Sequence, residues 1–328
     1  MSKTFISILK VTISVGLASL LLYLVFRNID WVDFWARAQS VDYSWVIVSI
    51  ILSIVAYVAR AYRWNILLEP LGYNLKTSRT TLAVLIGYLA NLALPRLGEI
   101  TRCGILNRND KVSMPVAIGS VVAERVVDML TLLVLIFISL IIESERLMTF
   151  LNQAYKDLNI PNYVIGIVLI LGLLGMSVLI VFVKRQDRLK GKFAELIKGF
   201  INGILSLRKI KRPVGFLVST MILWLVYFLM SYIIVFSLPE TSHLGIGAGF
   251  MLLVTGGIAI SLPVQSGFGT YHGMIAGMLL LYSIDETTGV FLATLLHTSQ
   301  IVAIALFGTI AIIISFLIRR ASVKKTTN

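Results

Sequence analysis

Cysteine and histidine are scarce in this sequence. Among 328 residues there are one cysteine and three histidines, and no HExxH pattern is present. A single cysteine allows neither an internal disulfide nor a cysteine-based metal site. The histidines lie far apart along the chain, and no nucleotide-binding motif is present. The sequence therefore predicts no metal site and no cofactor.

Charge is scarce as well, whereas long apolar runs are abundant. Charged residues make up 14% of the chain and hydrophobic residues 58%, above the roughly 45–50% of a soluble domain. The mean hydropathy is +0.91. These features predict an all-α, polytopic transmembrane helical bundle, with one transmembrane domain over 1–328. We expect membrane segments at 6–26, 44–59, 81–95, 115–142, 162–183, 213–238, 247–262, 268–284 and 288–318.

Basic residues outnumber acidic ones, 29 to 16, and the formal net charge is +13. The excess lies in a few loops, which indicates membrane topology and attraction to anionic lipid, with no nucleic-acid partner. Loop 60–80, segment 184–212 and the C-terminal tail are basic and predicted cytoplasmic, whereas loop 143–161 is acidic and predicted outside. We therefore expect a multi-pass protein of the cell membrane with both termini in the cytoplasm.

The order of these loops predicts two re-entrant hairpins. Loop 60–80 is predicted inside, and segment 115–142 must start inside because it ends in the acidic loop. Segment 81–95 then returns to the side it came from, turning at Pro95 and Gly98. The same argument makes 247–284 a hairpin from outside, with its turn at Pro263, Gly267 and Gly269. A helix that simply leaves the membrane at Pro95 is the alternative, but it would place the basic segment 184–212 outside.

The two halves of the chain share an order of features. GYLANLALPRLG (87–98) resembles GGIAISLPVQSG (256–267), and VAIGSVVAERVVDM (116–129) resembles VFLATLLHTSQIVA (290–303). We therefore expect an inverted repeat, with repeat 1 at about 44–142 and repeat 2 at about 213–318, which in transporters places a site near the bilayer midplane. Chance similarity of apolar stretches is the alternative. Between the repeats, 184–212 is predicted to be a cytoplasmic amphipathic linker.

Segment 115–142 carries three charges near its middle, Glu124, Arg125 and Asp128. Charges at that depth are costly and seldom face lipid. Arg96, Glu99 and Arg102 are spaced three apart and are predicted to share a helical face beside them. Arginines at a helix N-terminus can bind a phosphate. A self-neutralising structural cluster, or arginines that reach the cytoplasmic surface, are the alternatives.

The second turn offers neutral polar groups. Its candidates are Gln265 and His272, and His297 and Gln300 lie at depth in the last segment. The predicted site is therefore ionic from one half and neutral from the other. Buried histidines that only satisfy packing are the alternative.

Four stretches resemble a known family: RW..LL...G (63–72), LPRLGEITR (94–102), VVAERVVDML (121–130) and LPVQSGFGTYH (262–272). Together they resemble the transmembrane region of lysylphosphatidylglycerol synthases, a flippase-like family. The resemblance implies movement of a lipid headgroup across the bilayer. The synthases also carry a soluble aminoacyl-transferase domain, and this chain ends soon after its last apolar run, so we expect no lipid aminoacylation. The family often carries a glutamate about where His272 stands, so a role resting on that acid is not expected.

We therefore expect a lipid translocase, not an enzyme, that acts on an anionic phospholipid or a polyprenyl-phosphate lipid. Arg96 and Arg102 would engage the phosphate, and the acids would pair with them or with a cationic headgroup. One alternative is a lipid-modifying enzyme with Glu124 or Asp128 as general base. The other is a non-transporting scaffold that acts through a partner.

Overall fold

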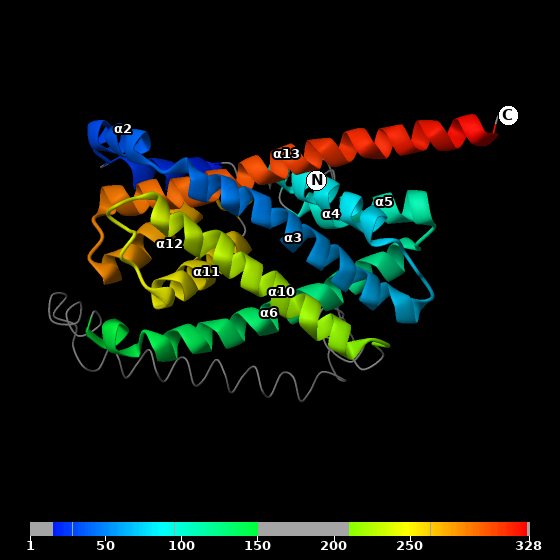
Figure 1. Cartoon of the computed structure of the whole chain (residues 1–328), viewed down its shortest axis with the longest axis horizontal. Coiled ribbons are helices and arrows are strands. Elements are labelled where there is room, and N and C mark those ends of the chain that lie inside the picture. Colours follow the sequence, from blue (N-terminus) through cyan, green and yellow to red (C-terminus); the bar gives the residue numbers. More distant parts are fainter. Residues whose placement is uncertain (1–15, 28, 95, 150–209, 263, 327–328) are drawn as a thin grey trace, which may run out of the picture.

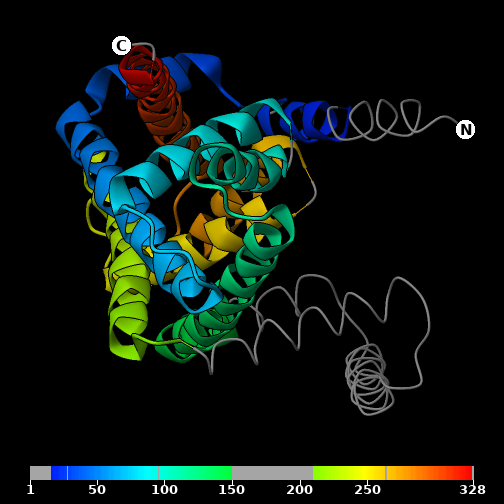
Figure 2. The ribbon, with the colours of Figure 1, turned by 90° about the vertical axis from the view of Figure 1, so that its right-hand side faces the viewer.

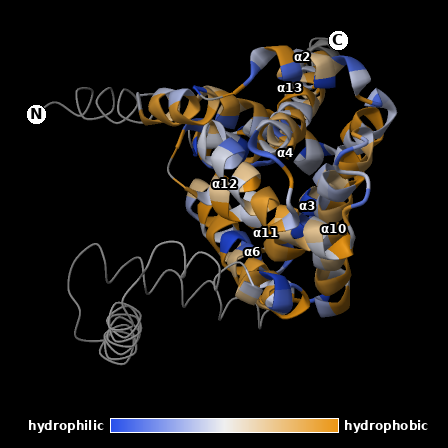
Figure 3. Cartoon of the chain, turned by 90° about the vertical axis from the view of Figure 1, so that its left-hand side faces the viewer, coloured by the Kyte–Doolittle hydropathy of each residue, from blue (hydrophilic) through white to orange (hydrophobic). Residues whose placement is uncertain are grey.

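The structure is a computed structural model that describes residues 16–27, 29–94, 96–149, 210–262 and 264–326. These residues form helices and short connections, and no strand is present among them. The all-α prediction is confirmed. Figure 3 shows hydrophobic residues along most of the helices. Many of the large apolar side chains point outward, for example Ile47, Phe137 and Met221, as expected for helices that face lipid.

Four long helices run along the long axis of the molecule (Figure 1). They are α3 (Tyr43–Leu68), which continues into η1 (Glu69–Leu71), α6 (Met114–Ile142), α10 (Pro213–Tyr232), which continues into η4 (Ile233–Ser237), and α13 (Glu286–Thr326). All four contain stretches long and apolar enough to cross a membrane. A bilayer core of about 30 Å needs roughly 20 helical residues.

Two helical hairpins lie between the long helices. The first consists of α4 (Thr77–Ala93) and α5 (Leu97–Asp110). The second consists of α11 (Ile246–Ser261), η5 (Gln265–Gly267), α12 (Thr270–Leu279) and η6 (Leu280–Tyr282). Their α-helices have 17, 14, 16 and 10 residues, all fewer than a full crossing requires. Figure 2 shows the long helices around the hairpins, seen from the end that carries α4 and α5.

The bundle has a basic end and an acidic end, and ion pairs and hydrogen bonds link the loops and helix ends within each. At the basic end, Arg212 pairs with Glu69 at 2.7 Å and Arg79 with Asp110 at 2.7 Å. Both ends of the first hairpin therefore lie there, because Arg79 is in the first turn of α4 and Asp110 ends α5.

The acidic end gathers the opposite loops. Arg37 lies on α2 (Trp31–Ser40), a short helix begun by Asp30 that the sequence analysis did not predict. It pairs with Glu240 at 2.6 Å and lies 3.8 Å from Asp285. The Arg146 guanidinium donates to Leu281 O at 3.5 Å, so the second hairpin has its outer ends here.

The tips of the two hairpins meet. The Gln265 amide donates to the carbonyl oxygens of Leu92 and Ala93 at 3.0 and 3.1 Å. The Ser266 hydroxyl donates to Asn91 O at 3.4 Å. These bonds satisfy carbonyls that the end of α4 leaves without an intrahelical donor.

Several segment boundaries differ from prediction. The predicted segment 44–59 ends too early, because α3 continues to Leu68 and contains Arg60 and Arg63. These arginines were assigned to a loop on charge alone, but both are buried. The predicted 162–183 segment, most of the linker 184–212, and the turn residues Pro95 and Pro263 lie outside the described residues, and of 6–26 only the part from Gly16 is described.

Candidate functional site

An ion cluster joins α3 to α6. Arg60 Nη1 contacts Glu124 Oε1, and Arg60 Nη2 lies 3.2 Å from Asp128 Oδ2. Arg63 Nη2 lies 2.6 Å from Asp128 Oδ1 and 3.4 Å from Glu124 Oε1. The side chains of Arg63 and Glu124 are fully buried. Because such charges are stable only when paired, the cluster fixes the register between the two helices.

The first hairpin adds Arg102 to this cluster. Its Nη1 lies 3.0 Å from Glu124 Oε2, and its guanidinium stacks over the Trp64 ring, 4.5 Å from the centroid. The Trp64 indole donates to the Ser120 hydroxyl at 2.8 Å. Arg102 is therefore held by Trp64 of α3 on one side and by Glu124 of α6 on the other. Its position beside Glu124 is the one that the sequence predicted.

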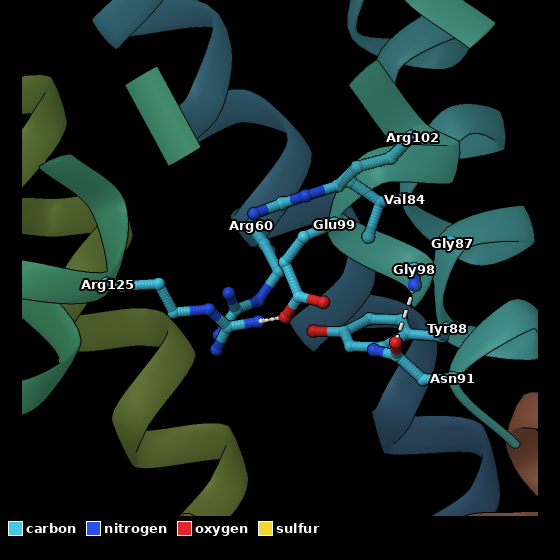
Figure 4. Close-up of a pocket in the computed structure, with 9 residues that line it drawn as sticks. All are labelled: Arg60, Val84, Gly87, Tyr88, Asn91, Gly98, Glu99, Arg102 and Arg125. Atoms are coloured by element: carbon cyan, nitrogen blue, oxygen red, sulfur yellow. Dashed lines mark hydrogen bonds and ion pairs between the residues drawn. The ribbon is translucent and has the colours of Figure 1, made fainter. Parts of the chain in front are cut away.

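A second, more exposed pair lies beside the buried one (Figure 4). Arg125 Nη2 donates to Glu99 Oε1 at 2.7 Å, and Arg125 Nη1 lies 3.9 Å from Asp128 Oδ2. The side chains of Arg125 and Glu99 are 47% and 25% exposed. Glu99 thus faces Arg125, and the predicted group of Glu99, Arg102, Glu124, Arg125 and Asp128 is brought together.

Arg96 does not follow the predicted face. It lies in the left-handed region with φ 61° and precedes the first residue of α5. The spacing of three applies only within a helix, so it fails at this residue. Arg96 is exposed at the hairpin turn and is in none of the ion pairs formed by the described residues.

The cluster carries a small excess of positive charge. Four arginines, Arg60, Arg63, Arg102 and Arg125, face three acids, Glu99, Glu124 and Asp128, which gives a formal net charge of +1. Within the described part of the chain, the donors Arg63 Nε, Arg63 Nη1 and Arg102 Nη2 and the acceptors Glu99 Oε2 and Glu124 Oε2 are buried without a hydrogen-bond partner. Buried polar atoms without partners are costly. An anion beside Arg102 would give its Nη2 an acceptor.

A small pocket opens onto this cluster. It is partly open, with an empty volume of ≈ 210 Å³, and it is lined by Arg60, Val84, Gly87, Tyr88, Asn91, Gly98, Glu99, Arg102 and Arg125. In Figure 4 the Tyr88 hydroxyl points toward the Glu99–Arg125 pair. Most of this volume is open solvent or too narrow to hold a molecule, and the remaining room suffices for about one water. A phosphate would therefore enter only after a lining side chain moves.

Close packing of the first hairpin positions the pocket. Asn91 Oδ1 accepts from the Gly98 N–H at 2.6 Å. A Cβ on Gly98 would lie 2.1 Å from Gly87 O, so α4 and α5 can approach this closely only with glycine at this position. Gly98 was predicted as a turn residue, but it belongs to α5. Its physical role is close helix contact.

The turn glycines of the second hairpin agree with prediction. Gly267 and Gly269 have φ of 76° and 79°, a region that favours glycine. Ser266 also has a positive φ, 48°, and its carbonyl lies 2.9 Å from His297 Nε2. Since a carbonyl only accepts, His297 carries the proton on Nε2 in this contact.

The neutral residues of the second half pack on one another. The Tyr271 ring stacks on His297 at 5.0 Å between centroids, and His272 meets His297 edge-on at 5.1 Å. Gln300 Nε2 lies 3.4 Å from the Tyr271 hydroxyl. The structure thus gathers His272, His297 and Gln300 behind the second tip. Among the described residues, no ion pair or hydrogen bond joins them to the charges of the first half.

Sequence reasoning missed Arg60 and Arg63 as site residues. A usable signal was present, because they are three positions apart and both therefore fall on one helical face. Glu124 and Asp128 also required cationic partners inside the membrane. Trp64, Tyr88 and Asn91 carried no comparable signal.

Known proteins resemble this chain over most of its length. The sequence model of the lysylphosphatidylglycerol synthase TM region matches residues 7–308. A glycosyltransferase, AglD, of Haloferax volcanii is 24% identical over 80% of this chain and 48% of its own length. A UPF0104 membrane protein of Methanocaldococcus jannaschii is 27% identical over 38% of this chain and 34% of its own length.

The chain thus spans about half or less of the length of these curated relatives. No solved structure matches it. The family match covers α3, α6, α10, both hairpins and the first part of α13, and the predicted resemblance is confirmed. The chain is a multi-pass membrane protein and belongs to the family of the lysylphosphatidylglycerol synthase transmembrane region.

Proposed function

We propose that this protein translocates a phosphate-bearing lipid headgroup past a site between two re-entrant hairpins. The buried arginine cluster at the first hairpin carries the proposal, because it has a net positive charge and the unpartnered donor Arg102 Nη2 beside a small, partly open pocket. The lipid is an anionic phospholipid or a polyprenyl-phosphate lipid. No nucleotide motif is present in the sequence, so a gradient or mass action drives the movement.

The positions of the outer ends and tips of the two hairpins support the re-entrant arrangement. The first hairpin has both outer ends at the basic end of the bundle, and the second has both at the acidic end. The two tips contact each other through Gln265. Placed in a bilayer along the long helices, the two tips lie at depth. The positive-inside rule then puts the basic end in the cytoplasm of a cell-membrane protein.

An inverted repeat is supported by element boundaries and packing. Helix α4 ends at Ala93 and α11 at Ser261, 168 residues apart, and α6 begins at Met114 and α13 at Glu286, 172 residues apart. Helix α6 packs on α5 and α11, and α13 packs on α12 and α4. Each long helix therefore contacts its own hairpin and that of the other half. Transporters with this design bind substrate where the repeats meet.

Arg102 and Arg125 are the residues that we propose to hold the phosphate. Both line the pocket, and guanidinium groups bind phosphate through paired N–H donors. Glu99 pairs with Arg125 in the structure, so an incoming phosphate would exchange with a carboxylate. Gln265, His272, His297 and Gln300 then position the second tip and do not bind charge. Arg96, exposed at the turn, would make the first encounter with the lipid.

The enzymatic alternative requires a free base. Glu124 and Asp128 are each held by two or more arginines, so neither carboxylate is free to reach a substrate proton. The name of the Haloferax volcanii relative, a glycosyltransferase, points to glycosyl transfer as the enzymatic candidate. Product formation from candidate lipid donors would support it. If the protein is instead a non-transporting scaffold, the arginine cluster would only hold the helices together.

The test is translocation of a fluorescent phospholipid and of a polyprenyl-phosphate lipid in proteoliposomes. We expect wild-type protein to speed it above empty liposomes. Arg102→Gln and Arg125→Gln should lower the rate by about tenfold or more, the worth of one charged hydrogen bond. Arg79→Gln, which breaks the exposed pair with Asp110 on the same hairpin, is the matched control and should stay near wild type. A folded Arg125→Gln variant with the wild-type rate would contradict the site.

A further inference from the structure

A second pocket lies at the acidic end, away from the arginine cluster. It has an empty volume of ≈ 380 Å³ and is partly open. Its lining comes from the end of α6, the start of α11 and η6: Glu143, Arg146, His243, Leu244, Gly245, Ala248 and Tyr282. These are described residues from three separate parts of the chain, and the proposed translocation site does not use their polar groups.

One buried group in this pocket lacks a partner. Tyr282 is 8% exposed, and its hydroxyl lies near the Glu143 carboxylate without a hydrogen bond of good geometry. Its ring is covered by the Arg146 guanidinium, 4.5 Å from the centroid. A buried hydroxyl without a partner lowers stability and persists more readily where it binds something. The hydroxyl therefore points to a ligand.

The start of α11 adds donors to the same pocket. Gly245 precedes the 16-residue helix and provides no side-chain cap, so the first-turn N–H groups lack an intrahelical acceptor. Gly245 and Ala248 both line the pocket. A helix N-terminus favours an anion, and the exposed His243 imidazole lies on the same wall. Together with Arg146, these groups suit a phosphate.

The pocket also holds one acid. Glu143 Oε2 lies 3.0 Å from Arg146 Nε. Its other oxygen presses on the first turn of α11, where a Cβ on Gly247 would lie 1.7 Å away. The side chain of Glu143 is only 12% exposed. A plain anion would be repelled by this carboxylate, whereas an amine would pair with it.

We propose that the acidic-end pocket binds a phosphate–amine group of the phosphoethanolamine class. The phosphate contacts Arg146, the Tyr282 hydroxyl and the start of α11, and the amine pairs with Glu143. The group can belong to a phospholipid headgroup or to a soluble phosphoethanolamine. The proposal does not require transport, because it concerns equilibrium binding at a separate site.

The test is binding of three probes to the full chain in detergent, measured by titration calorimetry. The probes are a short-chain phosphatidylethanolamine, the matching phosphatidylglycerol, which has no amine, and soluble phosphoethanolamine. We expect the phosphatidylethanolamine to bind more tightly than the phosphatidylglycerol. Tighter binding of the lipid than of soluble phosphoethanolamine assigns a lipid headgroup, and the reverse assigns a soluble ligand. Equal affinity for the two lipids would overturn the amine assignment.

Two variants separate a ligand role from a structural one. Tyr282→Phe removes only the unpartnered hydroxyl, so it should weaken binding about fivefold, as loss of one neutral hydrogen bond does, while leaving thermal stability equal or higher. Arg146→Gln should weaken it further. Arg37→Gln, at the same end but outside the pocket, should bind as wild type does. A Tyr282→Phe variant with unchanged affinity would overturn the proposal.

Discussion

The two hairpins have the same architecture and opposite chemistry. The first presents Arg102 and Glu99 to a cluster of buried ions, whereas the second closes on His297, Tyr271 and Gln265, which carry no formal charge in these contacts. Both are pairs of short antiparallel helices, and their tips touch. The difference indicates that backbone geometry creates the meeting point, while the charge that could bind a lipid phosphate comes from one half.

The largest expected effect tests the charged half. Glu124→Gln would leave Arg60, Arg63 and Arg102 without their shared carboxylate, and breaking a buried ion pair costs about 3–5 kcal/mol. We expect a large fall in the melting temperature in detergent, together with poor yield. His297→Gln, the matched change behind the second tip, should cost much less, because its contacts are aromatic packing and one hydrogen bond. Equal losses would mean that the halves do not differ.

A smaller effect tests helix packing in the first hairpin. Gly98→Ala would bring a Cβ within 2.1 Å of Gly87 O, whereas Gly104→Ala on the same helix meets nothing within 4 Å. Overpacking of this kind costs about 1–3 kcal/mol. Gly104→Ala should be neutral or slightly stabilising because alanine favours a helix. The melting temperatures of the two variants measure the contrast, and similar values would refute the close approach.

The contact between the tips should be weaker still. Gln265→Ala removes donors from the carbonyls of Leu92 and Ala93, and we expect a loss of about 1–2 kcal/mol. Amide hydrogen exchange should become faster on both sides of the contact, at 90–94 and 264–268. Thr270→Ala, whose hydroxyl bonds lie within the second hairpin, is the control. Faster exchange at these positions in Thr270→Ala but not in Gln265→Ala would mean that Gln265 does not link the two tips.

The smallest expected effect lies outside the membrane, at the acidic end. Partial burial opposes the charge of Asp285, but hydrogen bonds from Thr288 and the nearby Arg37 outweigh it and lower the pKa of Asp285. Its stabilising contribution is therefore present above the unfolded pKa, near 3.9, and is lost as pH falls through the folded value. Asp285→Asn should lose slightly less stability than wild type on acidification below about pH 4. A steeper loss of stability in Asp285→Asn than in wild type would contradict the lowered pKa of Asp285.

The charges of the loops predicted two re-entrant hairpins, because they fix on which side of the membrane each segment begins and ends. The structure shows a pair of short helices at each of the two places, and their re-entry stays a prediction. The sequence placed Arg102 beside Glu124 because both fall on regular helical faces. It failed at Arg96, since the helix starts one residue later and the residue adopts a left-handed conformation. It also failed at Arg60 and Arg63, because loop charge and buried charge look alike until a partner is identified. The tip contact through Gln265 depends on tertiary packing, for which the sequence has no local signal.

Site-specific cysteine accessibility tests the central claim most directly, namely that the first hairpin turns inside the bilayer. Cys103 is buried and would be replaced by serine, after which single cysteines at Leu94 and Ile100 are labelled from each side of sealed vesicles. Ser242, at the acidic end, serves as the freely accessible reference. We predict weak labelling at Leu94 and Ile100 from the side that labels Ser242. Labelling there as fast as at Ser242 would contradict the hairpin and restore a helix that crosses the membrane.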